Sequence, residues 1–118
     1  MTLKSLKVAC VGAGVIGSGW VARLLLNGVS VTVFDKNVDS YQRTKEIIER
    51  ASKSYSRLTE APLRKHGTVV FSNTLEDALI DVNYVIESLP ENLEIKREAY
   101  TEIQKISEVI TGIVTTQN

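Results

Sequence analysis

Three closely spaced glycines near the start of the chain leave its backbone few possible arrangements. They form a G-x-G-x-x-G pattern whose residues are Gly12, Ala13, Gly14, Val15, Ile16 and Gly17. An apolar run over 6–11 precedes the pattern and is typical of a strand that is buried on both faces of a parallel sheet. Apolar residues at helical spacing follow over 15–26. The pattern is therefore predicted to connect a strand to a helix.

In a loop between a strand and a helix, each of the three glycines is needed for a physical reason. Gly12 permits a tight turn, Gly14 leaves the backbone open to a pyrophosphate, and Gly17 lets the helix pack close to the strand. The helix N-terminus adds free N–H groups and a partial positive charge. Asp35 ends a second predicted strand over 30–34, within the interval of about 20 residues expected for an acid that binds an adenosine ribose. The alternative is a glycine-rich turn that binds nothing, but the strand, the helix, the spacing and the acid together favour a dinucleotide.

The carboxylate of Asp35 favours NAD over NADP as the cofactor. It can accept a hydrogen bond from the ribose 2′-hydroxyl, and it repels a 2′-phosphate. Lys36, the next residue, weakens this preference slightly. Enzymes that use S-adenosylmethionine also place an acid after a second strand, but they do not require the third glycine at this spacing.

Strand-like and helix-like segments alternate along the rest of the chain. Further strands are predicted over 68–71, 83–87 and 109–115, and further helices over 38–58, 74–79 and 93–106. This alternation predicts an α/β protein of the Rossmann type, with a doubly wound parallel sheet in the strand order 3-2-1-4-5 that ends after strand five. Because no repeat or linker divides residues 1–118, we expect one domain. Cys10 and Trp20 are predicted to pack in its core, under the glycine loop.

Charge and composition argue against several other classes of protein. The 14 basic residues balance 14 acidic ones, so no general electrostatic attraction to nucleic acid or to a membrane surface is expected. The single cysteine excludes an internal disulfide and a Cys-rich zinc site. The single histidine, His66, has no clustered ligands and is interpreted as a surface residue, so no metal is expected. No apolar run reaches the ~18 residues of a membrane span, and no secretory signal is recognisable, so we expect a cytoplasmic protein.

The segments 8–20 and 31–35 resemble the opening of the 3-hydroxyacyl-CoA dehydrogenase family. Two later segments, 57–63 and 85–96, are similar to its L-carnitine dehydrogenase branch in particular. The second of them contains a Glu-Ser-x-Pro-Glu-x-Leu-x-x-Lys block, which is more specific than the glycine pattern. The resemblance covers essentially the whole chain.

The resemblance implies a role for each matching residue. Residues 12–17 would bind the pyrophosphate and Asp35 the adenosine ribose, while Glu91 and Lys96 would lie near the nicotinamide ribose. Without the resemblance, these last two would be interpreted as a helix-start acid and a solvated lysine. The implied activity is hydride transfer to NAD from a small 3-hydroxy substrate, either L-carnitine or a 3-hydroxyacyl-CoA compound. A homodimer is implied for the complete protein.

The family's catalytic histidine and its supporting glutamate lie beyond this point in the chain, and His66 fits neither position. We therefore expect no catalytic residue in 1–118. The chain is predicted to be the N-terminal portion of a longer enzyme with a C-terminal helical domain, and to be inactive alone. Asn118 stands where the family has a serine, and we assign it no catalytic role. A basic group is interpreted as a charged helix face rather than a CoA site; it comprises Lys45, Lys53, Arg57, Arg64 and Lys65.

Two other functions remain open from the sequence. A stand-alone module that senses nucleotides would use the same glycine loop and acid without catalysis. The long helix over 38–58 and the block with Glu91 and Lys96 argue against it. A catalytically inactive interaction protein on the same scaffold is the other, since a fold alone does not determine a function.

Overall fold

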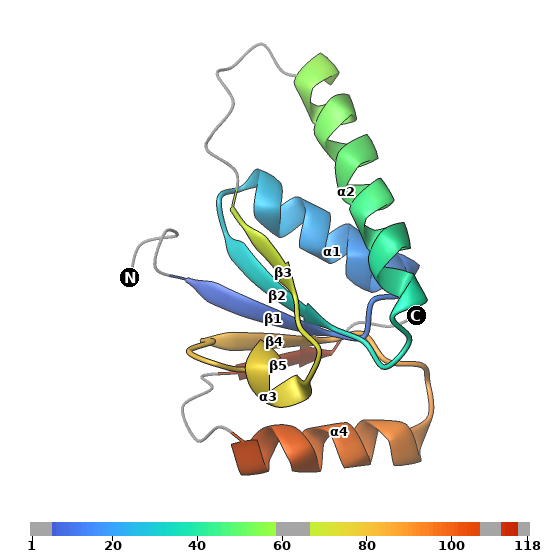
Figure 1. Cartoon of the computed structure of the whole chain (residues 1–118), viewed down its shortest axis with the longest axis vertical. Coiled ribbons are helices and arrows are strands. Elements are labelled where there is room, and N and C mark those ends of the chain that lie inside the picture. Colours follow the sequence, from blue (N-terminus) through green and yellow to red (C-terminus); the bar gives the residue numbers. More distant parts are fainter. Residues whose placement is uncertain (1–5, 59–66, 107–111, 116–118) are drawn as a thin grey trace.

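A computed structural model describes residues 6–58, 67–106 and 112–115 of the chain. Its sheet consists of β1 (Lys7–Val11), β2 (Ser30–Phe34), β3 (Val69–Phe71), β4 (Tyr84–Glu87) and β5 (Gly112–Thr115). The order across the sheet is β3-β2-β1-β4-β5, and every neighbouring pair is parallel. The predicted strand order and fold class are confirmed (Figure 1). Residues 109–111 of the predicted fifth strand lie outside the described residues.

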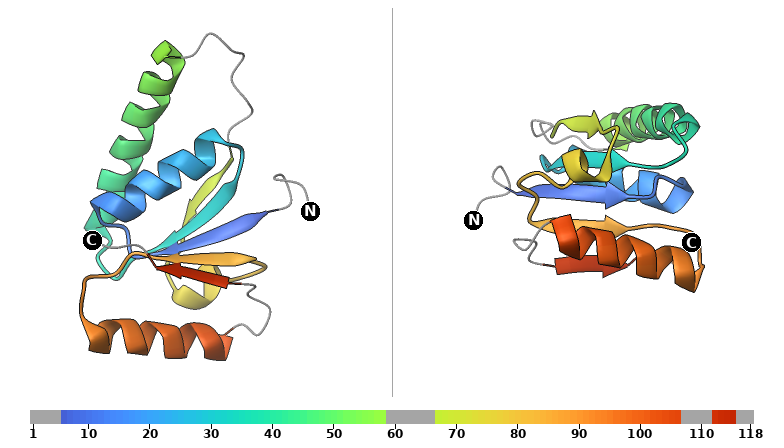
Figure 2. Two further views of the ribbon diagram at one scale, coloured as in Figure 1. Left: turned by 180° about the vertical axis from the view of Figure 1, so that it is seen from behind. Right: turned by 60° about the horizontal axis from the view of Figure 1, so that its bottom comes forward.

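Within the described residues, four helices connect the strands and cover both faces of the sheet. They are α1 (Val15–Leu26), α2 (Asp39–Leu58), α3 (Leu75–Ala78) and α4 (Leu93–Ile106). Figure 2 shows α1 and α2 on one face of the sheet and α3 and α4 on the other. This doubly wound arrangement follows from right-handed crossovers between parallel strands. Among the described residues, no helix has the length and apolar character needed to cross a membrane.

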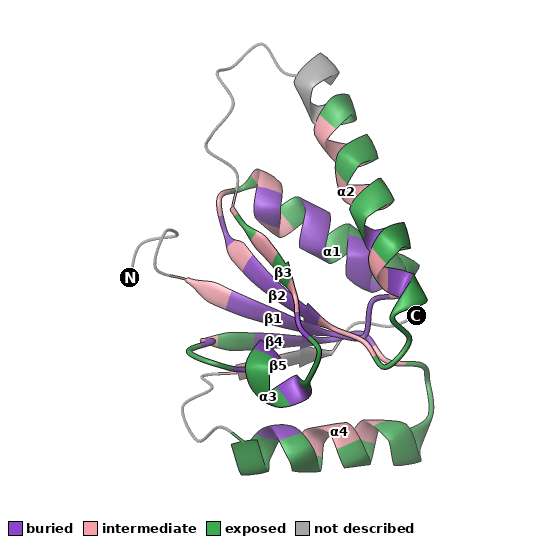
Figure 3. Ribbon diagram, in the orientation of Figure 1, coloured by how far each residue is buried: buried purple, intermediate pink, exposed green. Residues whose placement is uncertain are grey.

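The alternation of side chains along β1 builds two separate cores. Val8 and Cys10 pack with residues of α1 and β2, whereas Ala9 and Val11 pack with residues of α3, β4 and α4. Because successive side chains of a strand point to opposite faces, a strand in the middle of the sheet is expected to be predominantly apolar on both faces. Buried residues accordingly concentrate in the central strands and on the inner side of α1 (Figure 3).

The expectation that Trp20 packs in the core is wrong, although the same expectation for Cys10 is confirmed. The positions of α1 that face the sheet are Gly17, Ser18, Val21, Ala22 and Leu25. At 3.6 residues per turn, position 20 lies on the opposite side of this helix. Trp20 is therefore 40% exposed, and the Arg23 guanidinium lies 5.5 Å from its ring centroid.

Candidate functional site

The candidate site lies at the carboxyl end of the sheet, where the chain order reverses between β1 and β4. Val11, the last residue of β1, is paired with Phe34 on one side and with Glu87 on the other. The loops that leave β1 and β4 therefore emerge next to each other. In open parallel sheets this crevice is where ligands bind.

The three glycines of the loop have different surroundings. Gly12 has a φ of +94°, and a Cβ there would lie 2.7 Å from the Ser88 carbonyl oxygen. A Cβ at Gly17 would lie 2.7 Å from the Gly12 carbonyl oxygen and 2.9 Å from the Ser88 side chain. A Cβ at Gly14 would meet nothing within 4 Å. The fold itself therefore requires Gly12 and Gly17, whereas Gly14 leaves open space in front of the backbone.

The open space at Gly14 adjoins the N-terminus of α1. Gly14 is the N-cap residue of this helix and provides no side-chain acceptor to its first turn. The N–H groups of that turn have no intrahelical partners, and no acidic side chain occupies it. Uncapped N–H groups and the helix dipole together attract an anion. The residues present thus fit a diphosphate.

Asp35 follows β2 and contacts the glycine loop directly. One of its carboxylate oxygens accepts a hydrogen bond of 2.6 Å from the Ala13 N–H, and the other accepts one of 2.8 Å from the Asn37 N–H. The carboxylate therefore connects the end of β2 to the glycine loop. The spacing in the sequence does not reveal the contact between Asp35 and the Ala13 N–H. The binding of a ribose by Asp35 stays a prediction.

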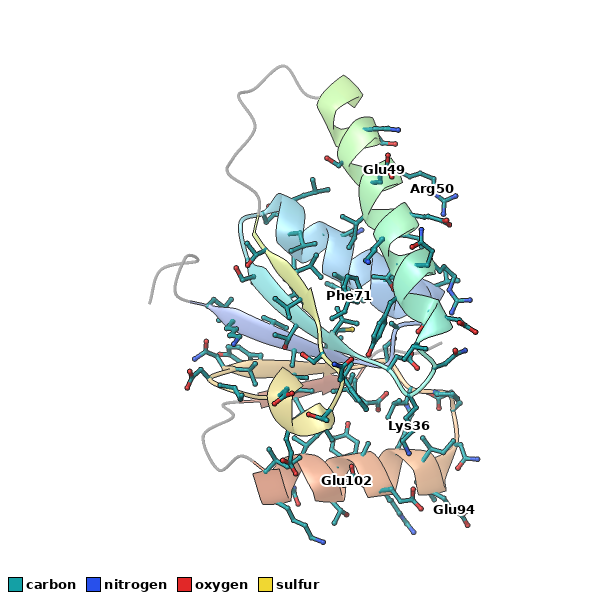
Figure 4. All side chains as sticks on the ribbon, in the orientation of Figure 1. Lys36, Glu49, Arg50, Phe71, Glu94 and Glu102 are labelled. Atoms are coloured by element: carbon teal, nitrogen blue, oxygen red, sulfur yellow. The ribbon has the colours of Figure 1, made fainter. Side chains whose placement is uncertain are left out.

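A cavity of about 270 Å³ lies beside Asp35, between the end of the sheet and α4. Lys36, which lies just after β2, and Glu102 on α4 both line it; both side chains are labelled in Figure 4. Its apolar walls come from Val11, Phe34, Leu75, Leu89, Pro90, Ile95 and Ala99. An apolar slot with a polar rim suits a flat heterocycle that carries a polar ribose.

Glu91 and Lys96, which the sequence placed in one motif, are in direct contact. The Lys96 ammonium lies 2.8 Å from a Glu91 carboxylate oxygen and 3.4 Å from one of Glu87. The hydrogen bond with Glu91 raises the pKa of Lys96, and the charge of Glu87 adds to the effect, although desolvation opposes both. The Lys96 side chain is only 14% exposed. The interpretation of Lys96 as a freely solvated lysine is therefore wrong.

Sequence reasoning assigned no role to Glu87, the first residue of the Glu-Ser-x-Pro-Glu-x-Leu-x-x-Lys block. Its side chain is fully buried, and its second oxygen accepts a hydrogen bond of 2.7 Å from the Leu89 N–H. The available signal was an acidic residue at the last position of a strand predicted to be buried, since carboxylates are almost never fully buried unless they are paired.

Several other predicted features lie away from this site. On α2, the Lys45 ammonium lies 5.3 Å from the Phe71 ring centroid, and Lys53 pairs with Glu49 at 3.3 Å. Both contacts fit the interpretation of a charged helix face. In the described part of the chain no group of His, Cys, Asp or Glu residues could hold a metal ion. His66, Arg64, Lys65 and Asn118 lie outside the described residues, as does the side chain of Arg57.

Comparison with known families and proteins agrees with this geometry. Residues 7–117 match the family model described as "3-hydroxyacyl-CoA dehydrogenase, NAD binding domain". The chain is 39% identical over 97 residues to an L-carnitine dehydrogenase of Mesorhizobium japonicum, covering 82% of this chain and 27% of the relative. It is 42% identical over 92 residues to an L-carnitine dehydrogenase of Streptomyces coelicolor, covering 78% and 29%. The chain thus spans less than a third of these relatives.

Solved structures share the fold. An NAD⁺-dependent dismutase, described as 5-formyl-3-hydroxy-2-methylpyridine 4-carboxylic acid 5-dehydrogenase, matches with a TM-score of 0.84 at 28% identity, over 98% of this chain and 37% of that one. The (S)-3-hydroxybutyryl-CoA dehydrogenase of Ralstonia eutropha matches with a TM-score of 0.75 at 23% identity, over 98% and 41%. The second likeness is evidence for the fold alone.

Proposed function

This chain belongs to the family of 3-hydroxyacyl-CoA dehydrogenase NAD-binding domains, and from that premise we propose that its glycine loop holds NAD for hydride transfer from a 3-hydroxy substrate. The observation that carries the proposal is the open face of Gly14. It lies at the uncapped N-terminus of α1, whereas Gly12 and Gly17 are closed by neighbouring atoms. A loop needed only for folding has no reason to keep a glycine at the open position.

In this proposal the main chain binds the phosphates and Asp35 selects the sugar. The first-turn N–H groups of α1, at Val15, Ile16 and Gly17, donate to the diphosphate. The Asp35 carboxylate accepts from a ribose hydroxyl and disfavours a 2′-phosphate. The adenine occupies the cavity that Lys36 and Glu102 border.

Glu91 and Lys96 belong to the nicotinamide end of the site. Glu91 lies in the loop before α4 and Lys96 near the start of that helix, both on the β4 side of the crevice, and Asp35 lies on the β2 side. A dinucleotide that spans the glycine loop would thus extend from Asp35 to Glu91 and Lys96. The nicotinamide ring, once bound, supplies the hydride-accepting chemistry, and the Lys96 ammonium orients its ribose.

The relatives' names support L-carnitine as the substrate, with 3-hydroxyacyl-CoA compounds as the second choice. Because the chain spans less than a third of those relatives, we propose that it is the cofactor-binding part of a longer enzyme. The acid–base group that takes the hydroxyl proton would then come from outside the described residues. We further propose a cytoplasmic location and a homodimer for that enzyme.

Isothermal titration calorimetry of the chain with NAD and with NADP tests the binding step. We expect NAD to bind about tenfold more tightly than NADP, which is a difference of about 1.4 kcal/mol in binding free energy. Absence of heat with both nucleotides would refute the proposal. A second assay follows NADH formation by the full-length gene product with L-carnitine and with 3-hydroxybutyryl-CoA. Tight NAD binding without any turnover would support a nucleotide-sensing module instead.

A further inference from the structure

We propose that Glu87 is a positioning residue, which holds the Lys96 ammonium and the loop 88–91 in the geometry that binds the nicotinamide end of the cofactor. This inference rests on the function proposed above. It extends that function to a residue which contacts Lys96 and the loop rather than the cofactor.

Glu87 occupies a central place in the sheet. It is the last residue of β4 and pairs with Val11 of β1 and with Thr115 of β5. Its side chain is fully buried, while the Lys96 ammonium at 3.4 Å belongs to a side chain that is 14% exposed. One carboxylate thus contacts both the loop, through the Leu89 N–H, and α4, through Lys96.

The same loop is held against the phosphate-binding glycines on its other side. The Ser88 N–H donates to the Val11 carbonyl oxygen at 2.9 Å. The Ser88 carbonyl oxygen lies 2.7 Å from the position that a Cβ at Gly12 would take. Little room therefore separates the loop from the glycines, and a shift of Ser88 would displace Gly12. Glu87 consequently influences both ends of the proposed cofactor site.

Packing alone does not explain an acidic residue at position 87. Its neighbours in the strand, Val85 and Ile86, are buried and apolar. Burying a charge pair costs desolvation energy that can exceed the attraction between the charges, so a pair of apolar residues of similar size is often equally or more stabilising. Glu91 by itself would hold Lys96 only weakly, because its side chain is 59% exposed and exposed pairs contribute little. We therefore infer that the buried Glu87 carboxylate serves to fix the position of the Lys96 ammonium rather than to stabilise the fold.

The variant Glu87→Gln tests this directly. Glutamine keeps the shape and an acceptor for the Leu89 N–H, but it loses the charge that faces Lys96. We expect NAD affinity to fall about tenfold, within the range for residues in one salt-bridge network. The urea midpoint should fall as well, because Lys96 loses one of its two carboxylate partners, so NAD affinity is measured on samples that are folded in the absence of urea. Glu94→Gln is the matched control. Glu94 is exposed in the first turn of α4, the helix that carries Lys96 (Figure 4), and this change should leave NAD affinity unaltered.

A double-mutant cycle with Lys96→Met shows whether Glu87 acts through the lysine. In the Lys96→Met background, Glu87→Gln should cause no further loss of NAD affinity. An equal loss in both backgrounds would mean that Glu87 supports only the fold, and would overturn the inference. Normal NAD affinity of Glu87→Gln would overturn it as well.

A second variant keeps the inference falsifiable if Glu87→Gln does not fold. The double variant Glu87→Met with Lys96→Met replaces both charges by apolar chains of similar length. We expect it to fold with a urea midpoint no lower than that of the unsubstituted chain, and to bind NAD as weakly as Lys96→Met alone, about tenfold below the unsubstituted chain. Normal affinity, or a loss explained by partial unfolding, would contradict the inference. Failure of the unsubstituted chain to bind NAD would instead refute the proposed function and remove the premise used here.

Discussion

Substituting alanine at Gly14 separates cofactor binding from folding. Gly14 has φ −73° and ψ −172°, an extended conformation that any L-residue adopts, and the new methyl group would meet nothing within 4 Å. A substitution of glycine by alanine at such a position gains about 0.4–1 kcal/mol from the unfolded state. Alanine is, however, a poorer N-cap than glycine. We therefore expect the free energy of unfolding to change by less than about 1 kcal/mol.

The effect on binding should be much larger. If the diphosphate lies against the Gly14 backbone, the methyl group occupies space that the ligand needs. Forcing a methyl group into a packed contact costs typically about 1–3 kcal/mol, which corresponds to a loss of NAD affinity of about fivefold to about 140-fold. Calorimetric titration gives the affinity, and urea unfolding of the same sample gives the stability.

Gly19→Ala is the matched control. Gly19 is an exposed residue within α1, and its Cβ would also meet nothing within 4 Å. We expect stabilisation by about 0.5–1 kcal/mol, since glycine is unfavourable inside a helix, and unchanged NAD affinity. Gly17→Ala should behave in the opposite way and destabilise the fold, because its Cβ would lie 2.7 Å from the Gly12 carbonyl oxygen. A folded Gly14→Ala protein that binds NAD normally would refute the reasoning.

Three further changes test other parts of the structure. Asp35→Ala removes the acceptor of the Ala13 N–H as well as the ribose carboxylate; we expect at least a tenfold loss of NAD affinity and a smaller preference for NAD over NADP, measured by calorimetry with both nucleotides. Burial, with the charge of Asp35 adding, raises the pKa of Cys10 from 9.0 to about 12. The folded state thus binds the thiol proton more tightly, so its stabilising contribution is complete below pH 9 and is lost as the pH rises towards 12; urea unfolding of Cys10→Ala should lack this part of the decline. Thr74→Ala removes the oxygen that accepts from the Asp77 N–H at the start of α3, which should cost about 1 kcal/mol in urea unfolding without changing NAD affinity.

The order and direction of the strands were predictable because local patterns determine them. The apolar run before Gly12 and the β-branched residues before Asp35 identify strands that are buried on both faces. The Thr74 cap was also predictable, since a capping oxygen and its N–H partner lie only three residues apart. Features of this kind depend on neighbouring residues and can be recognised without a structure.

The surroundings of the site residues depend on contacts between distant segments and could not be predicted. Whether Gly12 or Gly14 faces open space is decided by Ser88, which lies more than 70 residues away in the chain. The contact between Lys96 on α4 and Glu87 in β4 likewise joins residues of two different elements. The expectation that Trp20 is buried was an error of a different kind. The helical periodicity that places Trp20 on the outer side of α1 was present in the sequence, but it was not applied to this residue.

The central claim is that NAD lies across the carboxyl ends of β1 and β4, between Asp35 and Lys96. Titration of NAD into the ¹⁵N-labelled chain, followed by backbone amide resonances, tests it most directly. The account predicts the largest shifts at residues 13–17, with further shifts at Asp35 and over 88–96, and little change along α2. Shifts confined to another part of the molecule, or none at saturating NAD, would contradict it.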